Sequence, residues 1–213
     1  SDMGGVYTLG VSPGTTVNHN VIHDVYSFSY GGWGLYTDEG SSGIEMAYNL
    51  VYRTKTGGFH QHYGRENRIH NNIFVAGEEH QLQRTRTEEH LSFFFERNVV
   101  YWENESPLLG SNWADGRFRL DYNLYWNAGR EIRFPGGLSW QQWREQGHDQ
   151  HSRIADPKFV APERDDYRLQ ADSPAFELGF EAFDPAQAGR RTPRRLTAEL
   201  PPVPPGPALG TAG

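Results

Sequence analysis

Short apolar runs, each introduced by an asparagine, recur along the first 125 residues of the chain. Successive asparagines lie 29, 23, 26 and 25 residues apart in the segments Asn20-Val21-Ile22, Asn49-Leu50-Val51, Asn72-Ile73-Phe74, Asn98-Val99-Val100 and Asn123-Leu124-Tyr125. A repeat of this length with one aliphatic strand per turn is typical of a parallel β-solenoid. Asparagine bonds readily to the backbone of turns and tolerates left-handed conformations. We therefore expect these asparagines to stack at one corner of the solenoid.

A second strand is predicted in each coil, because a glycine recurs before an apolar residue. Three segments align in this way, with 29 and 24 residues between their glycines: Gly5-Val6-Tyr7-Thr8-Leu9, Gly34-Leu35-Tyr36-Thr37-Asp38 and Gly58-Phe59-His60-Gln61-His62. The fourth coil offers Gln81-Leu82-Gln83-Arg84 at about the same phase. Since successive side chains of a strand point to opposite faces, each segment contributes to both the interior and the outside.

The charged residues decide which face we assign to solvent. The inner face is predicted to hold Val6, Leu35 and Phe59 together with Thr8, Thr37, Gln61 and Gln83. The outer face is predicted to hold Tyr7, Tyr36, His60 and Leu82 together with Leu9, Asp38, His62 and Arg84. The opposite assignment would bury an acid, two histidines and an arginine, which is costly.

This phase places Asp38, His62 and Arg84 in one column on adjacent coils, about 4.8 Å apart per step. His60 lies on the same face, and Tyr36 lies beside it. An acid, two imidazoles and a cation gathered in this way predict a catalytic groove. The alternative is a charge-compensated ladder that only stabilises the solenoid.

The chain divides into three regions. Residues 1–127 are predicted to form the coils, 128–184 a terminal coil with a short helix and a cap, and 185–213 a proline-rich tail. The helix is expected within Leu138–Gly147, with Ser139 as N-cap and Gly147 at its end. No capping helix precedes the strand pattern that opens at Gly4, so we expect a longer solenoid whose start carried a secretion signal.

Composition narrows the possible partners. The net charge of −7 argues against a nucleic-acid partner, and no apolar stretch reaches the roughly 18 residues of a membrane span. The chain has no cysteine, which excludes disulfides and thiolate metal sites. Aromatic residues make up 14% of the chain and the mean hydropathy is −0.74, values that suit a solvated surface carrying sugar-binding rings.

Three segments resemble bacterial right-handed parallel β-helix proteins that act on polysaccharides, of the pectate-lyase-like kind. They are Asp2-Met3-Gly4-Gly5-Val6-Tyr7, Gly34-Leu35-Tyr36-Thr37-Asp38-Glu39-Gly40-Ser41-Ser42-Gly43 and Gly64-Arg65-Glu66-Asn67-Arg68-Ile69-His70-Asn71-Asn72-Ile73-Phe74. The nearest family by motif is glycoside hydrolase family 141, and the similarity covers most of residues 2–180. The resemblance implies a secreted or periplasmic enzyme that hydrolyses plant or algal glycans, with Asp2 and either Asp38 or Glu39 as its acid pair.

Strand geometry restricts that acid pair. Asp38 and Glu39 are neighbours and point to opposite faces unless the strand ends there, as Gly40-Ser41-Ser42-Gly43 suggests. Asp2 aligns seven residues before Asp38, which is too far for a pair in a straight strand. A bend at Gly4-Gly5 would bring Asp2 closer.

Three other functions remain open. A polysaccharide lyase would use His60 or His62 as base, with Arg84 and Arg86 holding a uronate carboxylate. A cation held by Asp38, His60 and His62 is a minority alternative to an enzyme without cofactor or metal. A noncatalytic glycan-binding solenoid would bind sugar on aromatic side chains. Four tryptophans are candidates for sugar subsites, although packing explains each equally well: Trp33, Trp102, Trp113 and Trp126.

Overall fold

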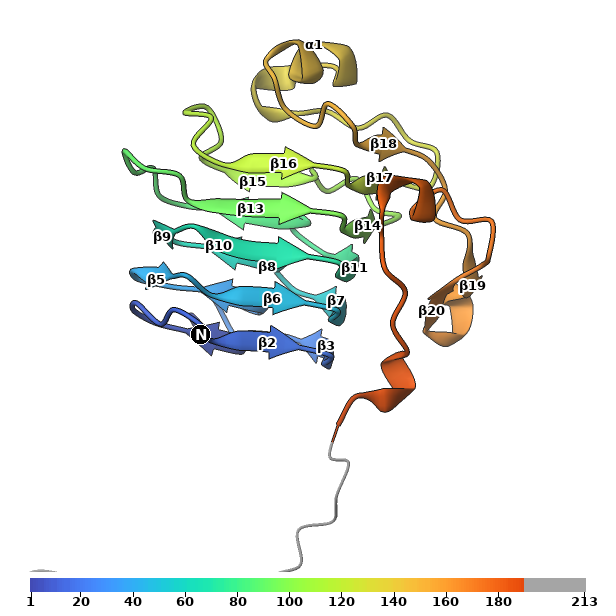
Figure 1. The fold of residues 1–213 in the computed structure, drawn as a ribbon, viewed down its shortest axis with the longest axis horizontal. Coiled ribbons are helices and arrows are strands. Elements are labelled where there is room, and N and C mark those ends of the chain that lie inside the picture. The colour runs from blue at the N-terminus through green and yellow to red at the C-terminus, as the bar shows by residue number, and fades with distance from the viewer. Residues whose placement is uncertain (190–213) are drawn as a thin grey trace, which may run out of the picture.

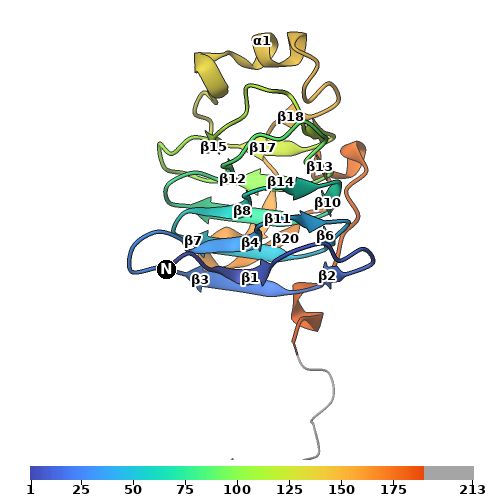
Figure 2. The same ribbon diagram turned by 90° about the vertical axis from the view of Figure 1, so that its left-hand side faces the viewer.

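The computed structural model describes residues 1–189 and shows a parallel β-solenoid of about six turns, which confirms the predicted all-β fold class. Three parallel sheets run along it (Figures 1 and 2). Sheet 1 contains β1 (Gly4–Thr8), β4 (Trp33–Thr37), β8 (Gly57–Gln61), β12 (Leu82–Arg84) and β15 (Leu109–Ser111). Sheet 2 contains β2 (Thr16–Asn18), β6 (Glu45–Ala47), β10 (Asn67–His70), β13 (Phe93–Glu96) and β16 (Arg119–Asp121). Sheet 3 contains β3 (Val21–Val25), β7 (Leu50–Thr54), β11 (Ile73–Gly77), β14 (Val99–Tyr101), β17 (Leu124–Trp126) and β18 (Arg153–Ile154).

Smaller elements complete the described chain. The short strands β5 (Ser41–Ser42) and β9 (Gly64–Arg65) pair in parallel, whereas β19 (Phe159–Ala161) and β20 (Asp166–Leu169) form an antiparallel hairpin. Four 3₁₀ turns occur: η1 (Pro135–Gly137), η2 (Pro162–Arg164), η3 (Phe176–Leu178) and η4 (Pro185–Gln187). Among residues 1–189, no helix is long and apolar enough to cross a membrane.

The predicted asparagine corner is confirmed. The five asparagines form a ladder, in which the side-chain amide of each of the first four donates to the side-chain oxygen of the next. The distances from Asn20 to Asn123 are 2.9, 2.9, 3.0 and 3.3 Å. The same oxygens accept the backbone N–H groups, and the hydroxyl of Ser152 accepts from the last one at 2.8 Å. The residue before each asparagine has a positive φ, which turns the chain at this corner: His19, Tyr48, Asn71, Arg97 and Tyr122.

The interior is a column of apolar side chains drawn from all three sheets. Leu35, Phe59 and Leu82 are in register on sheet 1 and are fully buried. Glycines let sheet 3 approach closely, because a β-carbon on Gly34 would lie 2.2 Å from Val51 and one on Gly58 would lie 2.7 Å from Phe74. Sheets 1 and 3 therefore meet without a gap at this edge.

The short helix α1 (Trp140–Glu145) closes one end of the core (Figure 1). Its N-cap is Ser139 and Gly147 follows with φ 92°, as the sequence predicted. Trp143 is buried in the core, and its indole N–H donates to the buried carboxyl of Asp149 at 2.9 Å. The aromatic helix thus replaces the next coil as cover for the core.

The C-terminal segment covers the outer face of sheet 3. Tyr167, Leu178 and Phe180 pack with strand residues of sheet 3 in a second apolar cluster. The predicted tail begins with η4, whose first turn is capped by Asp184. The rest of that prediction, from residue 190 onward, lies outside the described residues.

Candidate functional site

The outer face of sheet 1 carries most of the predicted site residues. Val6, Leu35 and Phe59 align on the inner side and Tyr7, Tyr36 and His60 align beside them, as predicted. The prediction for the fourth coil is wrong by one residue, because Leu82 continues the inner column and Gln83 aligns with His60. Arg84 consequently aligns with Gln61 and points inward.

Arg84 is fully buried and is not available to a substrate in this structure. Its guanidinium holds the Asp115 carboxylate through two hydrogen bonds of 2.6 and 2.9 Å and also donates to Ser92 at 3.1 Å. Burial opposes the ionised form of Asp115, yet the hydrogen bonds and charge of Arg84 hold its pKa below the ordinary value. The sequence argument placed Arg84 outside to avoid burying a charge, and the structure satisfies that charge internally instead.

The column of first residues after the last four strands of sheet 1, β4, β8, β12 and β15, therefore reads Asp38, His62, Thr85 and Asn112. Their backbone N–H groups bond to Thr8, Thr37, Gln61 and Arg84 of the preceding coils at 2.9, 2.9, 3.2 and 2.7 Å. We call these four residues the site row. Asp38 and His62 share a row as predicted, and Thr85 takes the place assigned to Arg84.

Thr85 links the two histidines. Its hydroxyl lies 2.8 Å from Nε2 of His60 and 2.7 Å from Nδ1 of His62. A threonine hydroxyl has a single proton, so one imidazole accepts from it and the other donates to it. His60 and His62 are thereby fixed by one side chain.

His60 was predicted to face solvent, but in the structure it lies against aromatic rings and is buried. Its ring centroid is 4.3 Å from that of Trp33 and 4.5 Å from that of Tyr36, and all three side chains are at most 2% exposed. Burial, followed by the nearby His62 and His80, lowers the pKa of His60 to about 2. Its Nδ1 has no hydrogen-bond partner. His60 is thus a neutral support for Tyr36.

Two carboxylates converge on a pair of tyrosines. The Tyr7 hydroxyl donates to Asp38 at 2.5 Å, the Tyr36 hydroxyl donates to Asp2 at 3.3 Å, and the two rings meet edge to face at 5.1 Å. The hydrogen bond to Asp38, together with burial, raises the pKa of Tyr7 to about 12. Burial raises the pKa of Tyr36 far above its ordinary value, and the nearby carboxylates of Asp38 and then Asp2 raise it further.

The position of Asp2 depends on a turn. Asp2 has φ 54° and its backbone N–H donates to the carbonyl of Tyr30 at 2.6 Å. This left-handed turn replaces the straight strand that would have kept Asp2 too far from Asp38, and it brings the Asp2 carboxylate to the Tyr36 hydroxyl.

Glu39 and Arg86 lie at the edge of this face and are exposed. The charge of Glu39 contributes to the raised pKa of Tyr7. The guanidinium of Arg86 lies 4.7 Å from the ring centroid of Tyr63, which itself lies 5.1 Å from that of His62. Within residues 1–189, no group of three or more histidine, aspartate or glutamate side chains is placed to hold a metal ion.

Sequence reasoning missed Thr85, Gln83 and Tyr30 as parts of this face. Trp33 is buried and donates its indole N–H to Gln83 at 2.7 Å, while half-exposed Tyr30 meets it edge to face at 5.0 Å. Trp102 and Trp113 are buried in the core and serve packing. Aligning Gln81-Leu82-Gln83-Arg84 residue for residue with Gly58-Phe59-His60-Gln61 would have placed Gln83 beside His60 and Thr85 beside His62.

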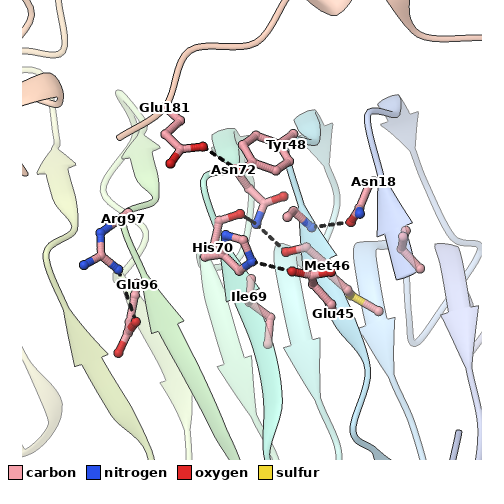
Figure 3. A network of polar contacts seen from close by, with 12 residues as sticks. Asn18, Glu45, Met46, Tyr48, Ile69, His70, Asn72, Glu96, Arg97 and Glu181 are labelled. Atoms are coloured by element: carbon pink, nitrogen blue, oxygen red, sulfur yellow. Dashed lines mark hydrogen bonds and ion pairs between the residues drawn. The ribbon is translucent and has the colours of Figure 1, made fainter. Parts of the chain in front are cut away.

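The outer face of sheet 2 and its corner differ from sheet 1, because their charged side chains pair with one another. His70 lies 2.8 Å from Glu45 and Arg97 lies 3.4 Å from Glu96, the two pairs joined by dashed lines in Figure 3. The hydroxyl of Tyr48 donates to Glu181 of the C-terminal segment at 2.7 Å (Figure 3). These pairs are partly exposed and explain the local charges without a ligand.

No protein-family model, curated protein or solved structure matches this chain. The membership of glycoside hydrolase family 141 that the motifs suggest therefore has no support beyond those motifs and the solenoid fold.

Proposed function

We propose that the chain is a carbohydrate-active enzyme that hydrolyses glycosidic bonds of a polysaccharide on the outer face of sheet 1. The observation that supports this most strongly is a pair of carboxylates held by two tyrosines whose rings meet edge to face, Asp38 by Tyr7 and Asp2 by Tyr36. Glycoside hydrolysis uses a pair of carboxyl groups about 5 to 9.5 Å apart, and in this proposal Asp2 and Asp38 form that pair.

In this proposal one acid protonates the leaving oxygen and the other acts as nucleophile or base. Tyr7 orients Asp38 and Tyr36 orients Asp2, since each phenol donates to its carboxylate. Tyr30, at 51% exposure, offers a ring on which a sugar can stack beside the acids. Glu39 is the alternative second carboxylate. A polymeric substrate of this kind lies outside the cell, so the proposal includes a secreted or periplasmic location.

A polysaccharide lyase is the second candidate, and the exposed Arg86 favours it. Arg86 and His62 both contact the ring of Tyr63. In a lyase, His62 would act as the base and Arg86 would bind the uronate carboxylate. Other features weaken this candidate. The raised pKa values of Tyr7 and Tyr36 disfavour a tyrosinate base, His60 is buried, and Arg84 is committed to Asp115.

The decisive experiment is the substitution Asp38→Asn, assayed on a panel of plant and algal polysaccharides. We expect release of reducing ends to fall about 100- to 10,000-fold, the usual contribution of a general acid or base. The thermal midpoint should stay within a few degrees of that of the wild-type protein. Asp172→Asn is the matched control, because Asp172 is an exposed carboxylate paired with Lys158 at 2.6 Å.

The products separate the candidates. A hydrolase releases reducing ends without near-ultraviolet absorbance, whereas a lyase forms an unsaturated uronate that absorbs there. Chelator should leave the activity unchanged if the two carboxylates act without a metal. Full activity in Asp38→Asn would refute the proposed role of Asp38, and binding without any turnover by the wild-type protein would favour a noncatalytic solenoid.

A further inference from the structure

A cavity of about 470 Å³ lies on the opposite side of a coil from the site row, between sheet 3 and the η2–β20 segment. Val75 and Ala76 of β11 form part of its lining, together with the rings of Tyr101 and Tyr167 and Pro162 of η2. The volume falls in the range of about 300 to 1,000 Å³ that is usual for small-molecule sites.

The cavity exists because the repeat changes at one position. Asp24, Arg53 and Ala76 are equivalent residues of successive coils, since Val25, Thr54 and Gly77 pair directly after them. All three have left-handed backbones, with φ of 55°, 52° and 55°. Arg53 reaches back to Asp24 at 2.6 and 2.9 Å and fills its corner, whereas Ala76 ends at its β-carbon. The space that a long side chain would occupy on this coil is therefore open.

The polar groups around the opening are held in place. Asn104 donates to the carbonyls of Gly77 and Glu78 at 3.1 and 3.3 Å, and its side-chain oxygen accepts from Ser106 at 3.0 Å. The Tyr101 hydroxyl donates to the carboxylate of Glu103. Tyrosine rings beside fixed amide and carboxylate groups suit a sugar, which has apolar C–H faces and a ring of hydroxyls.

Charge selects among sugars. Arg53 is the cation of the lining, and it is bonded to both Asp24 and Asp165. Glu103 and Glu163 are the acids of the lining, and Glu163 is paired with Arg164 at 3.5 Å, so four acids stand near two arginines. The surroundings therefore carry excess negative charge, which disfavours a uronate or a sulfated sugar and leaves neutral sugars as the suitable ligands.

We propose that this cavity is a second, noncatalytic binding site for one or two residues of a neutral pyranose oligosaccharide. It is separate from the sheet 1 face and depends on the proposed function only in the choice of sugar as ligand class. A second site on the same coils would hold a polymer against the protein and raise its local concentration near the acids.

The test uses the full chain with ¹³C-labelled alanine methyl groups, because the Ala76 methyl reports on the cavity directly. Cellotriose, xylotriose and mannotriose are titrated separately up to about 10 mM, a range that detects weak sugar binding. We expect at least one of them to shift the Ala76 methyl resonance in a saturable way. Trigalacturonate should produce no saturable shift.

Two variants with matched backbones sharpen the test, and their binding is measured by calorimetry. Ala76→Arg places in this coil the residue that the preceding coil already carries at φ 52°, so it fills the cavity without a new backbone strain. It should weaken binding about tenfold or more. Ala76→Gly keeps the cavity open, relieves the left-handed alanine and should bind within about twofold of the wild-type protein.

The proposal is overturned if none of the neutral trisaccharides shifts Ala76, if trigalacturonate binds as well as they do, or if Ala76→Arg binds normally. Its failure is distinct from that of the proposed function. Asp38→Asn should bind the trisaccharide at the cavity as the wild-type protein does. If Asp38→Asn keeps full turnover while the cavity still binds, only the catalytic assignment is lost.

Discussion

The asparagine corner and the site row are two columns of the same solenoid, and they differ in how uniform they are. The corner repeats one residue type from Asn20 to Asn123, and each amide is bonded to the next. The site row changes at every coil, from Asp38 through His62 and Thr85 to Asn112. A uniform column satisfies the backbone at every step, whereas a varied column places different chemical groups about 4.8 Å apart. Uniformity therefore indicates a stabilising role, and variety indicates where chemistry can be assembled.

The boundary between interior and site row is tested most strongly by Arg84→Ala. This change leaves Asp115 without its bidentate partner, and we expect the free energy of unfolding to fall by about 3 to 5 kcal/mol. Urea denaturation at pH 7 measures it. The double variant Arg84→Met with Asp115→Asn should recover part of the loss, because it removes the uncompensated charge. A loss of turnover with unchanged stability would instead indicate that Arg84 lies in the groove and contacts the substrate.

The role of the uniform column is tested by Asn72→Ala. The variant loses the bonds to Asn98 and to the carbonyl of Met46 and leaves the backbone N–H of Asn49 unpaired in the interior. We expect a loss of about 2 to 4 kcal/mol in urea denaturation. Asn112→Ala is the control on the varied column, where Asn112 is exposed and bonds only the Thr85 carbonyl with its amide. A loss below about 1 kcal/mol is expected there, and equal losses would contradict the distinction.

A smaller effect is expected from pH, through His60. Its folded pKa lies near 2, whereas that of an unfolded histidine is about 6.5, so only the unfolded state gains this proton between the two values. Stability is therefore complete above about pH 6.5 and falls below it, by up to about 1.4 kcal/mol per pH unit for this residue. His80 and His148, whose pKa values are also lowered by burial, add to the slope.

The substitution His60→Phe keeps a ring between Trp33 and Tyr36 and removes this titration. Its unfolding free energy, measured in urea at pH 8, 6 and 5, should decline less steeply than that of the wild-type protein. Near pH 8 this residue should add no pH dependence to the free energy of unfolding of either protein. Parallel slopes in the two proteins would mean that His60 is not buried as described.

The fold was predictable because the same residue pattern recurs in each coil. The asparagines, the glycines and the apolar strands recur closely enough to define the asparagine corner and the register of three of the five sheet 1 strands. The placement of Arg84 was not predictable from its own coil, because its partner Asp115 lies 31 residues later in another loop. The approach of Asp2 to Tyr36 was equally hidden, since it requires a turn stabilised by the carbonyl of Tyr30. Contacts between loops of different coils leave no periodic trace in the sequence.

The corner with the ladder also has a constant length. Five residues separate the aligned positions of sheets 2 and 3 in each of five coils, as in Glu45 to Leu50 and Arg68 to Ile73. From sheet 1 to sheet 2 the separation varies, being 8 from Thr37 to Glu45, 7 from Gln61 to Arg68 and 10 from Arg84 to Phe94.

The asparagine ladder thus forms a spine, a corner of constant length, whereas the number of residues at the other corners can change from coil to coil. The variable corner after sheet 1 begins at the site row, and the cavity beside Ala76 borders the corner that follows sheet 3. Insertions and deletions at these corners leave the amide contacts of the spine unchanged. Descendants of such a chain can therefore exchange the loops that meet a ligand, one coil at a time, while the scaffold beneath them stays the same.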